Sequence, residues 1–215
     1  MVYGDTLNTS PTTVKQISSG EYVVAGRTNN GVGGVDLFLM KTDVNGNVLW
    51  TKTYGGVGLE MGGYMQPTTD GGYILAATAG GLNRGIYLVK TNPIGDTLWT
   101  RVYSHPTTPI WTYSVRQTSD DGYIVVGYQD EVGSVDDDVF LLKTDVNGDT
   151  LWTRSYGIRG FLMVEEGWDV KQTADGGYVV TGKTLIDNWW GDPFLFKTDS
   201  SGNLQWTKVY IQKSQ

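Results

Sequence analysis

The sequence predicts an all-β fold made of four repeats, each of four antiparallel strands. In four places a lysine stands nine residues before a tryptophan, and a tyrosine follows four residues later, as in Lys143, Trp152 and Tyr156. The polar turn between the lysine and the tryptophan, such as Asn147-Gly148, is typical of a tight β-hairpin. No segment shows the 3.6-residue apolar period of a helix. The four pairs are Lys41 with Trp50, Lys90 with Trp99, Lys143 with Trp152, and Lys197 with Trp206.

The third repeat shows the four expected strands most clearly. Strand A is expected over Tyr113–Thr118, B over Gly122–Tyr128, C over Asp138–Thr144 and D over Thr150–Tyr156. B and C are apolar without interruption, which indicates that both faces of the sheet are covered, whereas D alternates as an outer strand does. Strand A ends in a glutamine in each repeat, at Gln16, Gln66, Gln117 and Gln172. The innermost strands are predicted over residues 12–18, 62–68, 113–118 and 168–173.

The repeated tryptophans stand 49, 53 and 54 residues apart. Four-stranded sheets covered on both faces, at this spacing, are typical of the blades of a β-propeller. A β-solenoid is the alternative, but its strands are parallel and its repeat is usually shorter, whereas these turns require hairpins. We therefore predict one four-bladed propeller domain over residues 1–215, with blades at about 10–56, 57–105, 106–158 and 159–211.

Composition and charge exclude several kinds of function. The formal net charge of −7 repels nucleic acid, and no basic cluster offsets it. The chain has no cysteine and one histidine, His105, so zinc sites, thiolate catalysis and histidine-based triads lack their residues. No apolar run approaches the roughly 18 residues of a membrane helix. We expect no cofactor, no metal site, no nucleic-acid partner and no membrane insertion.

The repeated turns and tryptophans have a structural interpretation. A large ring repeated in the alternating strand D suits packing between blades. The turn Asp43-Val44-Asn45-Gly46-Asn47 places oxygen ligands at alternate positions, as a calcium loop does, but it is too short and lacks the distal glutamate. It also differs in spacing from the Asp-box of sialidases. These turns are therefore interpreted as hairpin turns.

The repeat pattern resembles a known family. Asp-Gly-Gly-Tyr, three apolar residues and Gly are followed by a loop, an apolar run, Lys-Thr-Asp, a turn glycine, Trp and Tyr-Gly. This pattern is similar to the bacterial and archaeal SBBP-type, or seven-bladed β-propeller-type, repeats, and more distantly to quinoprotein-like blades. The resemblance spans about residues 12–210, with departures at Asn92-Pro93, Gly85 and Ser18-Ser19-Gly20-Glu21. It implies a microbial surface or secreted propeller in which binding or scaffolding is commoner than catalysis.

The segments that vary between repeats, D to A and B to C, lie on one face of a propeller, and variable loops on one face often form the binding surface. The residue six positions before each strand A glutamine is Ser10, Glu60, Trp111 or Glu166, and we expect these four to surround one mouth of the channel. Aromatic rings beside carboxylates suit a sugar or a protein partner. The predicted ligand-binding residues are Trp111, Trp168, Trp189, Trp190, Glu60, Glu166, Asp136 and Asp137.

These observations lead to one expected function and two alternatives. We expect a non-enzymatic extracellular or cell-surface protein that binds a glycan or a surface protein through this face. The first alternative is a structural subunit that self-associates head to tail, because its two ends carry the same repeat phase. The second is a glycoside hydrolase that uses the acids Asp136-Asp137-Asp138 and Glu165-Glu166, since this reaction needs paired carboxylates.

Overall fold

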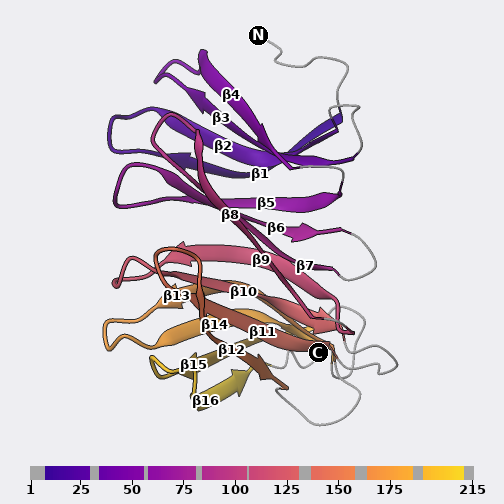
Figure 1. Ribbon diagram of the computed structural model, residues 1–215. Coiled ribbons are helices and arrows are strands. Elements are labelled where there is room, and N and C mark those ends of the chain that lie inside the picture. The colour runs from indigo at the N-terminus through magenta and orange to yellow at the C-terminus, as the bar shows by residue number, and fades with distance from the viewer. Residues whose placement is uncertain are drawn as a thin grey trace, which may run out of the picture. The chain divides into compact units, whose positions relative to one another are not determined.

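The computed structural model describes residues 8–29, 34–55, 58–80, 84–105, 107–130, 137–157, 164–185 and 191–210. These residues form sixteen strands in four separate sheets, and no helix occurs among them (Figure 1). No helix in this described part of the chain is long and apolar enough to span a membrane. The all-β propeller prediction, with four blades of four antiparallel strands, is confirmed.

Each blade consists of four consecutive strands, which are the predicted strands A to D. Blade 1 comprises β1 (Asn8–Gln16), β2 (Tyr22–Asn29), β3 (Asp36–Thr42) and β4 (Val48–Tyr54), and blade 2 comprises β5 (Glu60–Pro67), β6 (Tyr73–Ala79), β7 (Gly85–Thr91) and β8 (Thr97–Ser104). Blade 3 comprises β9 (Ile110–Gln117), β10 (Tyr123–Asp130), β11 (Asp137–Thr144) and β12 (Thr150–Tyr156), and blade 4 comprises β13 (Glu165–Gln172), β14 (Tyr178–Thr184), β15 (Asp192–Thr198) and β16 (Leu204–Val209).

The chain divides into two compact units, unit 1 over Met1–Tyr103 and unit 2 over Ser104–Gln215. In unit 1, strand β5 of blade 2 packs against β1, β2 and β3 of blade 1. In unit 2, strand β13 of blade 4 packs in the same way against β9, β10 and β11 of blade 3. Each unit therefore contains one complete joint between two blades. That all four blades form a single domain stays a prediction.

The strand D tryptophan and the tyrosine after it form the centre of each joint. In unit 1 the Trp50 ring meets the Tyr73 ring edge-on at 6.2 Å, and the Tyr54 hydroxyl donates to the Gly95 carbonyl at 2.7 Å. A Cβ added at Gly95 would lie 2.9 Å from the Trp50 ring, so this turn position has no room for a side chain. The structural interpretation of the repeated tryptophan is confirmed for this joint.

Unit 2 repeats this arrangement. The Trp152 ring meets Tyr178 at 5.8 Å, and the Tyr156 hydroxyl donates to the Gly202 carbonyl at 2.7 Å. Burial is the largest cause that raises the pKa of Tyr178, to about 12. The two joints are therefore copies of one design in which a donor face, with tryptophan and tyrosine, packs on an acceptor face, with tyrosine and a turn glycine.

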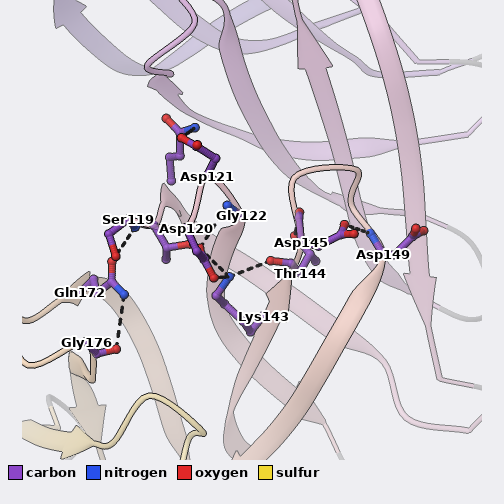
Figure 2. A network of polar contacts seen from close by, with 12 residues as sticks. Ser119, Asp120, Asp121, Gly122, Lys143, Thr144, Asp145, Asp149, Gln172 and Gly176 are labelled. Carbon is purple, nitrogen blue, oxygen red and sulfur yellow. Dashed lines mark hydrogen bonds and ion pairs between the residues drawn. The ribbon is translucent and has the colours of Figure 1, made fainter.

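The repeated strand C lysine forms an ion pair in every blade. Lys143 is almost completely buried, and its ammonium group donates to the Asp120 carboxylate and to the Thr144 carbonyl (Figure 2). Asp120 also accepts from the backbone of Gly122, so one carboxylate holds both the A–B turn and the lysine. In blade 1 the turn differs, but Glu21 still reaches Lys41 at 2.7 Å. The other pairs are Lys90 with Asp70 and Lys197 with Asp175.

Acid is expected to destabilise the fold through these pairs. Partial burial alone would raise the pKa of Asp70, but hydrogen bonds from Lys90, Thr68 and Gly72 outweigh it and lower the pKa to about 2, from 3.8. Between these values the unfolded chain binds the proton first, so stability present at neutral pH is lost as the pH falls. Tm should stay level from about pH 7 to 5 and decline between about pH 4 and 2.

The matched variant for this pH dependence is Asp70→Asn. It should lower Tm at neutral pH and shrink the acid decline, because its side chain does not titrate. Scanning calorimetry of both proteins across this range measures the difference. If both proteins lose Tm along parallel curves, this ion pair does not contribute to the acid sensitivity.

Candidate functional site

Strand A carries a β-bulge at the same place in each sheet. In β9 the pairing runs from Ser114 opposite Val126 to Thr112 opposite Gly127, which leaves Tyr113 as the extra residue. A bulge redirects side chains and is frequent beside binding sites. The residues at this bulge position are Thr12, Gly63, Tyr113 and Trp168. The two blades of unit 2 therefore carry an aromatic ring there.

Three aromatic rings gather at the bulge of blade 3. Trp111 and Tyr128 are cross-strand partners whose rings stack at 5.9 Å and 14°. The Tyr113 ring also stacks on Tyr128, at 5.9 Å and 24°. Glycine at position 127 permits this close approach of the strands, because a Cβ there would collide with the Trp111 carbonyl oxygen. The sheet thus holds the three rings in fixed orientations.

Carboxylates lie within electrostatic range of these rings. Burial is the largest cause that raises the pKa of the Tyr128 hydroxyl, and Tyr113, Asp137, Glu166 and Asp130 raise it further. Because Glu166 belongs to blade 4, its influence on Tyr128 connects the two blades of unit 2. The hydroxyl therefore stays protonated at neutral pH and is available as a hydrogen-bond donor.

Trp168 is an exposed ring held in place by its neighbours. Its side chain is 46% exposed, and its indole nitrogen donates to Glu166 Oε2 at 3.0 Å. The Lys183 ammonium group lies 5.7 Å from the ring centroid and pairs with Glu166 Oε1 at 3.2 Å. These contacts fix the orientation of an aromatic surface that remains open to solvent. We call Trp111, Tyr113, Tyr128, Asp137, Glu166 and Trp168 the loop-end patch.

The sequence predicted four of these six residues, namely Trp111, Trp168, Glu166 and Asp137. It did not predict Tyr113 and Tyr128, which it assigned only to strands A and B. The signals in the sequence were Gly127 and the two aromatic residues beside it across the strands, Trp111 and Tyr128. Trp189, Trp190 and Asp136 lie outside the described residues. Whether any of these residues binds a ligand stays a prediction.

The prediction that Glu60 occupies the same position in its blade as Ser10, Trp111 and Glu166 is wrong. Tyr22, Tyr123 and Tyr178 pair with Gln16, Gln117 and Gln172, but Tyr73 pairs with Pro67 and not with Gln66. Repeat 2 has one more residue between the glutamine and the tyrosine, and a shift of one residue moves a side chain to the other face of a strand. Met61 therefore takes the position of Trp111 and Glu166. Glu60 is buried, as its true equivalents Ile110 and Glu165 are.

The C–D turns use their aspartates as local caps. Asp43 Oδ1 accepts from the backbone nitrogens of Asn45 and Asn47, both at 2.8 Å, and Gly46 has a φ of +82°. Asp145 makes the same contacts with Asn147 and Asp149. These contacts agree with the hairpin-turn interpretation. Among the described residues, no group of three or more His, Cys, Asp or Glu side chains is placed to hold a metal ion.

Comparison with known proteins shows the fold and no family. No protein-family model matches the chain, and no curated protein matches it. A solved protein of unknown function from Dyadobacter fermentans is similar at 13% identity over 96% of this chain and 70% of that chain, with a TM-score of 0.63. A polysaccharide lyase, an ulvan lyase, is similar at 10% identity over 93% and 55%, with a TM-score of 0.65. An endo-arabinase from Bacteroides thetaiotaomicron is similar at 10% identity over 94% and 80%, with a TM-score of 0.57.

At these identities the likeness concerns the fold alone. It supports the propeller architecture, which carbohydrate-active enzymes and proteins of unknown function share. The resemblance to SBBP-type repeats stays a prediction.

Proposed function

We propose that this protein is a non-enzymatic extracellular binding module that holds a carbohydrate at the loop-end patch. The observation that carries the proposal is Trp168, because an exposed indole whose orientation is already fixed loses little freedom when a sugar ring stacks on it. Its contacts with Glu166 and Lys183 provide that fixed orientation.

The polar groups of the patch suit a neutral sugar. Asp137 and Glu166 offer carboxylate oxygens that accept hydrogen bonds from sugar hydroxyls, and the Tyr128 hydroxyl can donate. The net charge of −7 disfavours an anionic polysaccharide. The neighbour named as an endo-arabinase makes arabinan a suitable first ligand to test.

Trp168→Ala should weaken binding to the preferred polysaccharide by about tenfold, or about 1.4 kcal/mol, because it removes the stacking surface. Isothermal titration calorimetry with neutral polysaccharides measures the change. Leu151→Ala is the matched control, since Leu151 is an exposed apolar residue of the same unit, 57% exposed, on the outer strand β12. Equal affinities for the wild-type protein and Trp168→Ala, or no binding to any polysaccharide, would contradict the proposal.

The hydrolase alternative is tested with the same polysaccharides. Glu165, one of the acids that it would use, is 2% exposed and accepts a hydrogen bond from Thr184 at 3.3 Å, so this carboxylate does not face solvent. Release of reducing ends by the wild-type protein, abolished by Asp137→Asn, would favour the hydrolase over the binding module.

A further inference from the structure

The joint inside each unit shows what the two end blades of the chain are shaped to contact. On the acceptor side of unit 1, Met65 and Tyr73 of blade 2 are 3% and 1% exposed beneath blade 1. On the acceptor side of unit 2, Val170 and Tyr178 of blade 4 are 0% and 1% exposed beneath blade 3. Both joints thus bury one apolar residue of strand A and the first tyrosine of strand B.

Blade 1 has the same acceptor face, but that face is exposed. Val14, at the position of Met65 and Val170, is 62% exposed, and Tyr22, at the position of Tyr73 and Tyr178, is 36% exposed. A Cβ added at Gly46 would meet nothing within 4 Å, whereas one at the equivalent Gly95 would touch the Trp50 ring. The place that a tryptophan ring fills in the joint of unit 1 is therefore open at Gly46.

Blade 4 has the complementary donor face, which is also exposed. Trp206, equivalent to Trp50 and Trp152, is 39% exposed. Tyr210, equivalent to Tyr54 and Tyr156, is 53% exposed, whereas those two are 7% and 8% exposed within their joints. This end therefore carries the ring and the phenol hydroxyl that blade 1 is shaped to receive.

The charges of the two end faces also match those of the internal joints. In unit 1, Lys52 of the donor strand pairs with Asp96 of the acceptor turn at 3.1 Å. In unit 2, the pKa of Asp199 in the acceptor turn is lowered mainly by the hydrogen bonds that Asp199 accepts from Asn203. The positive charge of Arg154, on the donor strand, lowers it further. Blade 4 offers Lys208 at the position of Arg154, and blade 1 offers Asp43 at the position of Asp199. Cation and carboxylate again fall on opposite sides.

We propose that the donor face of blade 4 docks on the acceptor face of blade 1 in a second copy of this chain, and so repeats the internal joint between molecules. Such a head-to-tail contact is heterologous, so it produces a closed ring of copies or an open filament. On the donor face of blade 4, Thr181 and Pro193 occupy the positions that the buried Ala25 and Leu37 occupy in blade 1. The proposed joint therefore buries less apolar surface than the joint inside unit 1. Association should therefore be weak, so the fraction of associated chains should rise with protein concentration over the measured range.

Sedimentation velocity of the full chain over a range of concentrations tests the contact. The wild-type protein should shift to larger species as the concentration rises. Trp206→Ala and Tyr22→Lys should each weaken self-association at least about tenfold, because each removes one side of the joint. Leu151→Ala should associate as the wild-type protein does. Far-UV circular dichroism shows that each variant keeps its strands.

Mixing the two defective variants gives the sharper result. Trp206→Ala keeps an intact acceptor face and Tyr22→Lys keeps an intact donor face, so one joint can form between them and no further copy can add. The mixture should contain dimers at concentrations at which each variant alone is monomeric. A mixture no more associated than its components would overturn the proposal. A wild-type protein that stays monomeric at every concentration would overturn it as well.

Discussion

Replacing Trp152 with alanine should lower the free energy of unfolding by about 3 kcal/mol, the lower end of the usual range for removing a large buried aromatic side chain, because this ring packs against the core but is only partly buried. The ring packs against Tyr178 at 5.8 Å, carries the Arg154 guanidinium over it at 5.8 Å, and lies close to the Gly202 turn. Its loss leaves a cavity between blades 3 and 4 that backbone contacts around Gly202 hinder from closing. Urea denaturation followed by circular dichroism measures the difference.

Trp206→Ala is the matched control, because it removes the same residue from the same strand position in blade 4. The Trp206 ring is 39% exposed, so its removal should change the free energy of unfolding by less than about 1 kcal/mol at concentrations at which the chain is monomeric. Equal losses for the two variants would show that strand position, and not contact between blades, determines the contribution of this tryptophan.

Replacing Gly127 with alanine should lower the free energy of unfolding by about 3 kcal/mol, as strong overpacking does. The added Cβ would collide with the Trp111 carbonyl oxygen, a backbone atom that cannot move away without breaking the pairing of β9 with β10. The bulge that holds Trp111 and Tyr113 would shift with it. We therefore expect weaker binding at the loop-end patch together with the loss of stability, measured by urea denaturation and calorimetry.

Blade 2 supplies the control for this change. Ala77 occupies the position of Gly127 there, and its partner strand has Gly62 and Gly63 at the bulge, with φ of +115° and +121°. The strand therefore makes room for a methyl group, and Ala77→Gly should cost only about 1 kcal/mol through added freedom of the unfolded chain. A Gly127→Ala variant as stable as the wild-type protein would show that β9 also moves aside without loss.

The strands could be predicted from the sequence because their signals are local. The predicted strand over Thr150–Tyr156 has the same bounds in the structure, and the strand C prediction for that repeat differs by one residue. Lys143 was recognised as a repeat marker, but its ion pair with Asp120 depends on which turn lies beside the end of β11. Which turn lies there follows from the pairing register of the sheet, and the sequence of a single strand does not contain it.

The candidate site could be predicted only in part, for the same reason. Trp111, Glu166 and Trp168 were found because they interrupt a repeated pattern, whereas Tyr113 and Tyr128 reach the patch through a bulge and a cross-strand pair. The Glu60 error came from one additional residue between Gln66 and Tyr73. An additional residue moves a side chain to the other face of its strand, and counting six positions back from each glutamine does not detect that residue.

Each sheet consists of four strands that follow one another along the chain, and this connectivity has a consequence for folding. Every strand in the described sheets is hydrogen-bonded to the strand before or after it in sequence, so no pairing within a sheet waits for a distant segment. Loop-closure entropy stays small in such a topology, and folding is correspondingly faster than in sandwiches whose strands pair across the whole chain. A blade can therefore form its own hydrogen bonds as soon as its residues are synthesised, and a duplicated blade would extend the protein without changing the path of the rest.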